Sequence, residues 1–147
     1  GLNHPSTIKS ISNLAVVHTA KGEYNKAKDL FSIAISFYEK NFGPNHPNTA
    51  ICYSNLGMVH KELNDLIKAK EMLYKALTSD IKNLGDDHPA SAISYSNLAL
   101  VLQDLNEIPK AIVMSKKALD IFKKTLPDNH PNIKAVEEIY NHLKSLL

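Results

Sequence analysis

Residues 46–57 read HPNTAICYSNLG, and residues 88–99 read HPASAISYSNLA, which is the same pattern 42 residues later. The His-Pro pair that opens both stretches also occurs at residues 4–5 and 130–131, at the same spacing. A fixed period of this length indicates an array of like structural units stacked on one another. Arrays of this kind usually bind partners, so the period favours a binding protein over an enzyme.

Within each unit, apolar residues recur at helical spacing in two successive segments. Ile11, Leu14 and Ala15 share one face of the first segment, and Phe31 and Ala34 share one face of the second. Short polar breaks separate the two segments, as expected of a helical hairpin. We therefore predict an all-α protein with a single array over residues 1–147, comprising repeats at about 4–45, 46–87 and 88–129 and a final partial repeat or capping helix at 130–147.

The repeated His-Pro pair predicts where the first helix of each hairpin begins. Proline is tolerated in a first helical turn because its missing N–H costs little there, and the histidine before it is expected to help cap the helix.

A metal ion shared by these histidines is not expected. Zinc ligands lie about 2.0–2.1 Å from one ion, whereas helix axes of neighbouring hairpins lie roughly 8–10 Å apart. His18 and His60, at another recurring position, are interpreted as core or lining residues.

Composition narrows the class of partner and the compartment. The 44% hydrophobic and 22% charged residues are typical of a folded protein. All 17 basic residues are lysines and the formal net charge is only +2, so bulk charge favours neither nucleic acid nor an anionic membrane. The single cysteine, Cys52, permits no internal disulfide, and the opening residues lack the regions of a secretory signal. We therefore expect a cytoplasmic protein.

Motifs of catalysis and cofactor binding are absent from the sequence. We therefore expect no enzyme activity, no cofactor and no metal. An array that reads RNA needs side chains that differ between units, whereas Ser-Asn-Leu is unchanged at residues 12–14, 54–56 and 96–98. A nucleic-acid partner is therefore not expected either.

Three columns of small residues recur with the same period. They are Ala15, Gly57 and Ala99 in the first segments, and Ala27, Ala69, Ala111, Ala34, Ala76 and Ala118 in the second segments. These columns resemble the tetratricopeptide repeat, whose usual unit has roughly 34 residues. The longer period, with His-Pro at the junction, resembles the repeats of kinesin light chains. The resemblance implies a right-handed α-solenoid of about three and a half repeats that binds a protein or peptide partner.

In such a solenoid the first helices line a concave groove, and the resemblance implies that a repeated asparagine contacts a bound cargo peptide there. A carboxamide both donates and accepts hydrogen bonds, which suits the backbone of an extended peptide. Apolar residues one turn before and after the asparagines favour a partly apolar groove. The expected peptide-binding residues are Lys9, Ser12, Asn13, Val16, Ile51, Ser54, Asn55, Met58, Ile93, Ser96, Asn97 and Leu100.

Several alternatives remain open at this level. The asparagines are also suited to hydrogen bonds between adjacent helices, with their apolar neighbours buried by curvature. The array is also compatible with a structural scaffold that self-associates through exposed terminal repeats, or with a regulatory array of a larger multidomain protein. A chaperone-type carboxylate clamp is not favoured, because Ile93 and Asn97 stand where basic residues are required. Glu137 and Asn141 give the last segment the polar outer face of a cap, although a truncated repeat also fits.

Overall fold

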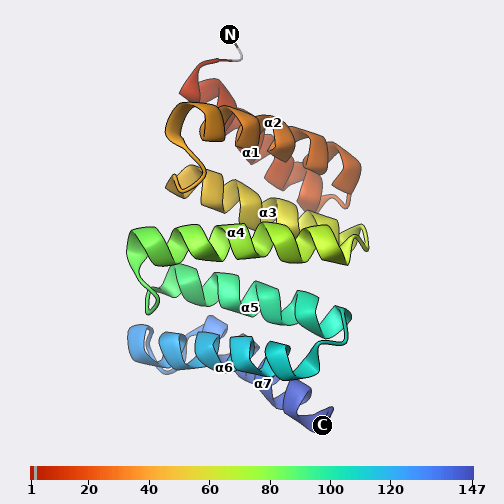
Figure 1. Ribbon diagram of the computed structural model, residues 1–147, viewed down its shortest axis with the longest axis vertical. Helices are drawn as coiled ribbons and strands as arrows, with labels where there is room; N and C mark the ends of the chain where they lie inside the picture. The colour runs from red at the N-terminus through yellow and green to blue at the C-terminus, as the bar shows by residue number, and fades with distance from the viewer. Residues whose placement is uncertain (2) are drawn as a thin grey trace. The chain divides into compact units, whose positions relative to one another are not determined.

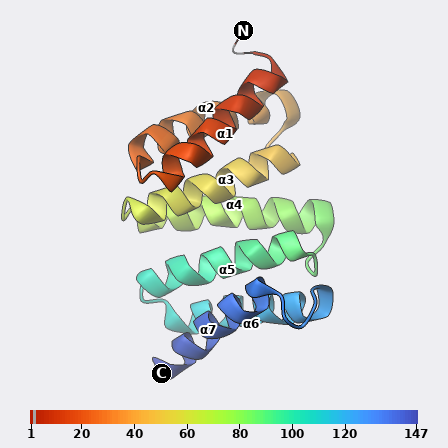
Figure 2. The ribbon, with the colours of Figure 1, turned by 180° about the vertical axis from the view of Figure 1, so that it is seen from behind.

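The computed structural model describes residue 1 and residues 3–147, and every regular element within them is an α-helix (Figures 1 and 2). The described residues form two compact units, residues 1–79 and residues 80–147. In the first unit, α1 and α3 form one layer, and α2 with most of α4 forms the other. In the second unit, α5 and α7 lie on one side and α6 on the other. The helices are α1 (Pro5–Ala20), α2 (Tyr24–Phe42), α3 (Pro47–Glu62), α4 (Leu66–Leu84), α5 (Pro89–Asp104), α6 (Ile108–Thr125) and α7 (Pro131–Ser145).

The first helix of each hairpin begins at the proline of a His-Pro pair, and the histidine is its N-cap. The Nδ1 atom of His46 accepts a hydrogen bond from the backbone N–H of Asn48 at 3.2 Å. His4, His88 and His130 accept the same bond from the residue two places on, at 3.2, 3.0 and 3.1 Å. Each bond satisfies one of the N–H groups that a helix start leaves without an intrahelical partner. The predicted capping role of these histidines is confirmed.

The turn inside each hairpin places one residue in the left-handed region. This residue is Gly22, at φ 75°, or Asn64 or Asn106, both at φ 60°. Glycine and asparagine tolerate this conformation best, which explains why only these two types occupy the column. In the first hairpin the next residue, Glu23, then forms an ion pair with Lys26 at 3.0 Å, near the start of the second helix.

Small residues permit the close approach of the two helices in a hairpin. A Cβ atom added at Gly57 of α3 would lie 2.8 Å from Leu73 Cγ and 3.2 Å from the carbonyl oxygen of Ala69, both on α4. Ala15 and Ala99, at the equivalent positions, are fully buried. The other alanine columns are fully buried as well, at Ala27, Ala69, Ala111, Ala34, Ala76 and Ala118. The packing expected from these columns is confirmed.

The core of the first unit forms where α2 packs against α3. Phe31, Ala34 and Tyr38 of α2 belong to the same buried cluster as Leu56 and Val59 of α3. Truncating a buried aromatic such as Phe31 to alanine costs about 3–5 kcal/mol in typical cores. In this unit α3 therefore packs on two sides, against its hairpin partner α4 and against the preceding second helix α2.

Leu14 departs from the packing expected for it. Leu14 is 47% exposed, whereas Leu56 and Leu98 at the equivalent positions are 5% and 0% exposed. The prediction that Leu14 packs with the stripe of Ile11 and Ala15 is therefore wrong. The reason is that this side of α3 is covered by α2, while no described helix covers the same side of α1.

In the second unit, α7 takes the place of a further first helix and packs against α6 and α5. Glu137 on α7 forms an ion pair with Lys123 at 3.1 Å, and Asn141 is exposed. Asn141 stands in the column of Gly57 and Ala99, where a close second helix requires a small residue. The outer side of α7 is therefore polar, as the sequence indicates.

Candidate peptide-binding surface

The expected binding residues of the first unit form a stripe along α1 and α3, which lie toward the viewer in Figure 2. On α3, Ile51 is 59% exposed, and Asn55 and Met58 are half-buried. On α1, Val16 is 49% exposed and Asn13 is also exposed. Aliphatic side chains at this level of exposure on two neighbouring helices provide an apolar surface with carboxamides between them. We call this set the first-helix stripe, and it consists of Lys9, Asn13, Val16, Ile51, Asn55 and Met58.

The second unit repeats the pattern on α5. Ile93 is 46% exposed, and Asn97 and Leu100 are half-buried. None of the three asparagines is buried in either unit. The apolar neighbours Val16, Ile51 and Ile93 remain exposed, so curvature does not bury them.

The hydrogen bonding of the asparagines differs between the units. Neither the Asn13 nor the Asn55 side chain hydrogen-bonds to another described residue. Asn97 already has an interaction partner in the structure. Both carboxamides of the first unit are therefore available to a ligand, which disfavours a role for them in bonding adjacent helices together.

The serines that precede the asparagines are less available. Ser12 Oγ donates to the carbonyl oxygen of Ile8 at 3.1 Å and lies 3.6 Å from Cys52 Sγ. Ser54 has an interaction partner too, and Ser96 is half-buried like the other two serines. Burial raises the pKa of the Cys52 thiol, which opposes formation of a reactive thiolate.

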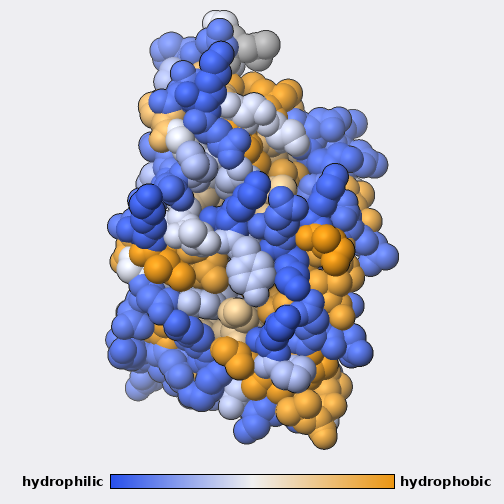
Figure 3. All heavy atoms as spheres, viewed as in Figure 1, coloured by the Kyte–Doolittle hydropathy of each residue, from blue (hydrophilic) through white to orange (hydrophobic). Residues whose placement is uncertain are grey.

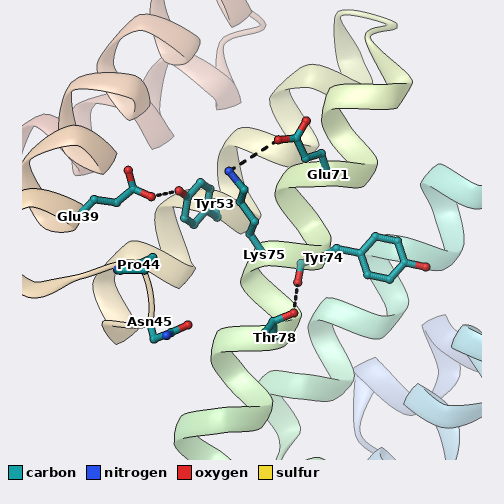
Figure 4. Close-up of a pocket in the computed structure, with 8 residues that line it drawn as sticks. All are labelled: Glu39, Pro44, Asn45, Tyr53, Glu71, Tyr74, Lys75 and Thr78. Atoms are coloured by element: carbon teal, nitrogen blue, oxygen red, sulfur yellow. Dashed lines mark hydrogen bonds and ion pairs between the residues drawn. The ribbon is translucent and has the colours of Figure 1, made fainter.

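A second surface, which the sequence did not suggest, is a hollow of about 510 Å³ on the second-helix side of the first unit. At its centre the Lys75 ammonium lies 5.2 Å from the Tyr53 ring centroid and 3.7 Å from Glu71 Oε1 (Figure 4). The Tyr53 hydroxyl donates to Glu39, and burial, followed by this contact, raises the pKa of Tyr53. The hollow is lined by Glu39, Pro44, Asn45, Tyr53, Glu71, Tyr74, Lys75 and Thr78.

The second unit has a related cluster one repeat later. Lys117 Nζ lies 5.1 Å from the Tyr95 ring centroid. Both side chains donate a hydrogen bond to the Asp86 carboxylate, and the Tyr95 hydroxyl lies 2.6 Å from Asp86 Oδ1. Lys117, and then Tyr95, hold the pKa of Asp86 below its ordinary value. The acid thus comes from the loop before α5 rather than from a preceding helix.

The charges of both clusters are paired internally, which indicates a packing role rather than a catalytic one. The sequence signal for these two clusters is that Tyr53 and Lys75 recur 42 residues later as Tyr95 and Lys117. Its meaning depends on how two helices pack, which the period alone does not give. The second-helix side of the hairpins, seen in Figure 3, is mainly hydrophilic with smaller hydrophobic patches.

The described residues contain no group of three or more His, Cys, Asp or Glu side chains arranged to hold a metal ion. His60, interpreted from the sequence as a core residue, is 6% exposed. His18 is half-buried, with Nδ1 2.7 Å from Glu23 Oε2. In the part of the chain that the structure describes, no helix has the length and apolarity needed to cross a bilayer.

Comparison with known proteins agrees with the repeat geometry. The family model for the tetratricopeptide repeat matches residues 6–82 and 67–124, and the chain belongs to this family. Among curated proteins, none matches the sequence significantly.

Solved structures show the same fold at low sequence identity. The nearly identical TPR-like repeats of a kinesin light chain from Podosopora anserina align with a TM-score of 0.86 at 22% identity, over 95% of this chain and 66% of that one. BtubC (BKLC) from P. vanneervenii aligns with a TM-score of 0.80 at 20% identity, over 96% of this chain and 60% of that one. This chain therefore spans less than two thirds of both structures.

A third match is the type III secretion chaperone SycD of Yersinia enterocolitica, solved in complex with a peptide of the translocator YopD. It aligns with a TM-score of 0.72 at 16% identity, over 97% of this chain and 96% of that one. Family membership and these matches confirm the expected all-α solenoid class, and its similarity in fold to kinesin light chain repeats. The tetratricopeptide repeat is in general a non-enzymatic fold for protein–protein interaction.

Proposed function

We propose that this chain is a non-enzymatic interaction module that binds an extended peptide segment of a partner protein along the first-helix stripe. The observation that carries the proposal is the combination found on α1 and α3. Val16 and Ile51 expose aliphatic surface. Asn13 is exposed and Asn55 is half-buried, and neither carboxamide has a partner among the described residues. In the second unit, α5 carries the equivalent asparagine, Asn97, which is half-buried and has an interaction partner.

The chemistry of the stripe selects the backbone and the apolar side chains of a ligand. A carboxamide donates to a peptide carbonyl and accepts from a peptide N–H, so each asparagine is able to anchor an extended strand. Burial of apolar side chains contributes about 25 cal/mol per Å², less the cost of ordering the peptide. Met58 is flexible enough to adapt to side chains of different shapes. We expect affinity in the micromolar range for a single segment.

Charge contributes little to this recognition. Lys9 is exposed, but Lys61 lies 3.9 Å from Glu62 at the end of α3, so attraction to an acidic ligand is opposed there. With no metal cluster among the described residues and a formal net charge of +2, we propose neither a cofactor nor a nucleic-acid partner. The buried free thiol of Cys52 suits a reducing compartment, and we place the module in the cytoplasm.

The proposal is tested with a peptide selected by display against the folded chain and then titrated by calorimetry. The double variant Asn13→Ala, Asn55→Ala is expected to weaken binding about tenfold or more, because two backbone anchors are lost at roughly 0.5–1.5 kcal/mol each. The matched control is Asn25→Ala, which removes an exposed carboxamide from α2 instead. Unchanged affinity in the double variant, at unchanged thermal stability, rejects the role of the stripe.

A further inference from the structure

A polar hollow of about 480 Å³ lies in the first unit, between the first half of α2 and the turn that joins α3 to α4. Its lining residues all belong to that unit, and described helices border it on both sides. We call it the α2–α4 hollow. Its polar lining consists of Asn25, Lys28 and Ser32 on α2, His60 on α3, Asp65 just before α4 and Lys68 in the first turn of α4.

A shortened acid leaves one lysine of this hollow without an ion pair. In the first hairpin Lys26 lies 3.0 Å from Glu23, and the equivalent pair of the third hairpin is separated by 2.8 Å. The second hairpin has Asp65 at the acidic position, and the equivalent Lys68 forms no ion pair with a described residue. The Lys68 ammonium is therefore available to an anion.

The histidine of the hollow lacks a partner for the same reason. In the first hairpin, His18 Nδ1 lies 2.7 Å from the glutamate at the acidic position. The equivalent His60 lines the hollow and is only 6% exposed, and its Nδ1 has no hydrogen-bond partner among the described residues.

A second lysine acts on the same ring from α2. Lys28 is half-buried and forms no ion pair with a described residue. Burial lowers the pKa of His60, Asp65 opposes this, and Lys68 and Lys28 lower the pKa further. The hollow thus holds two ammonium groups against one carboxylate, which leaves it a net positive charge.

The polar character of the hollow is not a requirement of the repeat. One repeat later, Ile67 and Leu102 occupy the positions of Asn25 and His60. Apolar residues therefore serve the fold at both positions. A buried ring nitrogen without a partner costs free energy, and a bound ligand accounts for it where the fold alone does not.

We propose that the α2–α4 hollow binds the phosphate group of a phosphate monoester, held by the ammonium groups of Lys28 and Lys68 and by the imidazole of His60. Such a group carries a charge of roughly −1.5 to −2 at pH 7 and three acceptor oxygens, which suits donors that line one hollow from three helices. Asn25 adds an exposed amide with two donor hydrogens.

The residue types favour phosphate over carboxylate. Lysine binds phosphate as a point charge, whereas planar recognition of a carboxylate favours arginine, which the chain lacks. A phosphorylated side chain of a partner and a small phosphate compound present the same group. The experiment below distinguishes these two sources.

The probes are a capped tripeptide with a central phosphoserine and glycerol phosphate, each titrated against the full chain. At about pH 7.5 both are mainly dianions, because their second pKa lies near 6. Nuclear magnetic resonance of the histidine rings should show a saturable shift of His60, with the exposed His142 unmoved. Tighter binding of the tripeptide assigns the site to a phosphorylated side chain, and tighter binding of glycerol phosphate assigns it to a small compound. The unphosphorylated tripeptide is expected not to bind.

Two pairs of substitutions separate a specific site from general charge attraction. Lys28→Gln combined with Lys68→Gln is expected to weaken binding about tenfold or more at unchanged thermal stability, because two charge-assisted hydrogen bonds are lost. The matched control, Lys40→Gln combined with Lys82→Gln, removes two lysines from the last turns of the same two helices. It changes the net charge equally and is expected to leave the affinity unchanged.

Substitutions of Asp65 test the arrangement in both directions. Asp65→Glu keeps the charge, but the longer carboxylate is expected to engage Lys68 and His60, as the glutamate of the first hairpin engages their equivalents, and to weaken binding about threefold or more. Asp65→Asn keeps an acceptor for the backbone N–H of Lys68 and removes the opposing charge. It is expected to strengthen binding about threefold or more.

Several results overturn the proposal. Absence of a saturable His60 shift with both probes shows that the hollow takes no phosphate. Equal weakening by the control pair shows that general charge attraction is responsible. Unchanged binding in Asp65→Glu, or weaker binding in Asp65→Asn, contradicts the arrangement. The hollow and the first-helix stripe share no residue, so the two proposals fail independently.

Discussion

His60 Nδ1 lies 3.5 Å from Asp65 Oδ2, whereas in the preceding hairpin His18 Nδ1 lies 2.7 Å from Glu23 Oε2. The histidines and the acids occupy equivalent positions one repeat apart. Aspartate is one methylene shorter than glutamate, which accounts for the wider separation in the second hairpin. His60 Nδ1 is consequently a buried polar atom without a hydrogen-bond partner among the described residues. Such a group costs free energy when the protein folds.

Lengthening the acid is expected to repair this contact. Asp65→Glu brings a carboxylate oxygen within hydrogen-bond distance of His60 Nδ1, as Glu23 already does for His18, and is expected to raise the free energy of unfolding by about 0.5–1.5 kcal/mol. Urea denaturation followed by circular dichroism measures the change. The same substitution in a His60→Leu background is expected to give no gain, and an equal gain there refutes the hydrogen bond as its cause.

His60 is also expected to make stability depend on pH. Burial lowers the pKa of His60, Lys68 and Lys28 lower it further, and Asp65 opposes them. The unfolded chain takes up this proton near the ordinary pKa of about 6.5, and the folded chain does so only at lower pH. The stability contributed by neutral His60 is therefore complete above about pH 6.5 and is lost as the pH falls below it.

The slope of unfolding free energy between about pH 7 and pH 5 measures this effect. His60→Leu, which copies Leu102 of the next repeat, is expected to make that slope shallower. His142→Gln removes an exposed histidine as a control and is expected to change the slope less. An unchanged slope in His60→Leu rules out His60 as the titrating group.

Gly57 is expected to resist substitution even by alanine, although alanine favours helices by about 1 kcal/mol over glycine. The new Cβ atom would lie 2.8 Å from Leu73 Cγ and 3.2 Å from the Ala69 carbonyl oxygen. Overpacking of a core costs typically 1–3 kcal/mol, so Gly57→Ala is expected to destabilise by up to about 2 kcal/mol. In a Leu73→Ala background the side-chain clash is absent, and the same substitution is expected to be neutral or stabilising. Thermal melts of the four proteins provide the comparison.

The His-Pro cap is expected to contribute a measurable share of stability. His46→Ala removes the acceptor for the Asn48 N–H and is expected to cost about 1 kcal/mol. His46→Asn supplies a side chain preferred at N-caps and is expected to restore most of the loss. Differential scanning calorimetry on the unmodified protein and the two variants decides between the two roles of His46. If the histidine acts only by packing, asparagine does not restore the lost stability.

Much of the fold follows from the period of the sequence. The His-Pro pairs mark where α1, α3, α5 and α7 begin, and the small-residue columns mark where the helices of each hairpin meet. The exposure of Leu14 did not follow, because one helical stripe cannot show that a first helix packs on two sides. Cys52 is one residue away from the stripe of Tyr53 and Leu56 in the sequence, yet it is 2% exposed because it belongs to the second packed side of α3.

The candidate site was predictable in part. The exposed stripe of Asn13 and Ile51 follows from helical geometry once the packed face is known. The pairing of Tyr53 with Lys75, and the unmet hydrogen bond of His60, depend on side-chain reach between separate helices. Equivalent side chains differ in length by one methylene between repeats. The period alone therefore does not predict whether these contacts form.

The most direct test of the central claim is a nuclear magnetic resonance titration of the labelled chain with the display-selected peptide. If the first-helix stripe binds the peptide, the side-chain amide signals of Asn13 and Asn55 shift first and most strongly, together with backbone signals of Val16 and Ile51. Shifts confined to residues of the hollow around Tyr53 and Lys75, with both carboxamide signals unmoved at saturation, would contradict it.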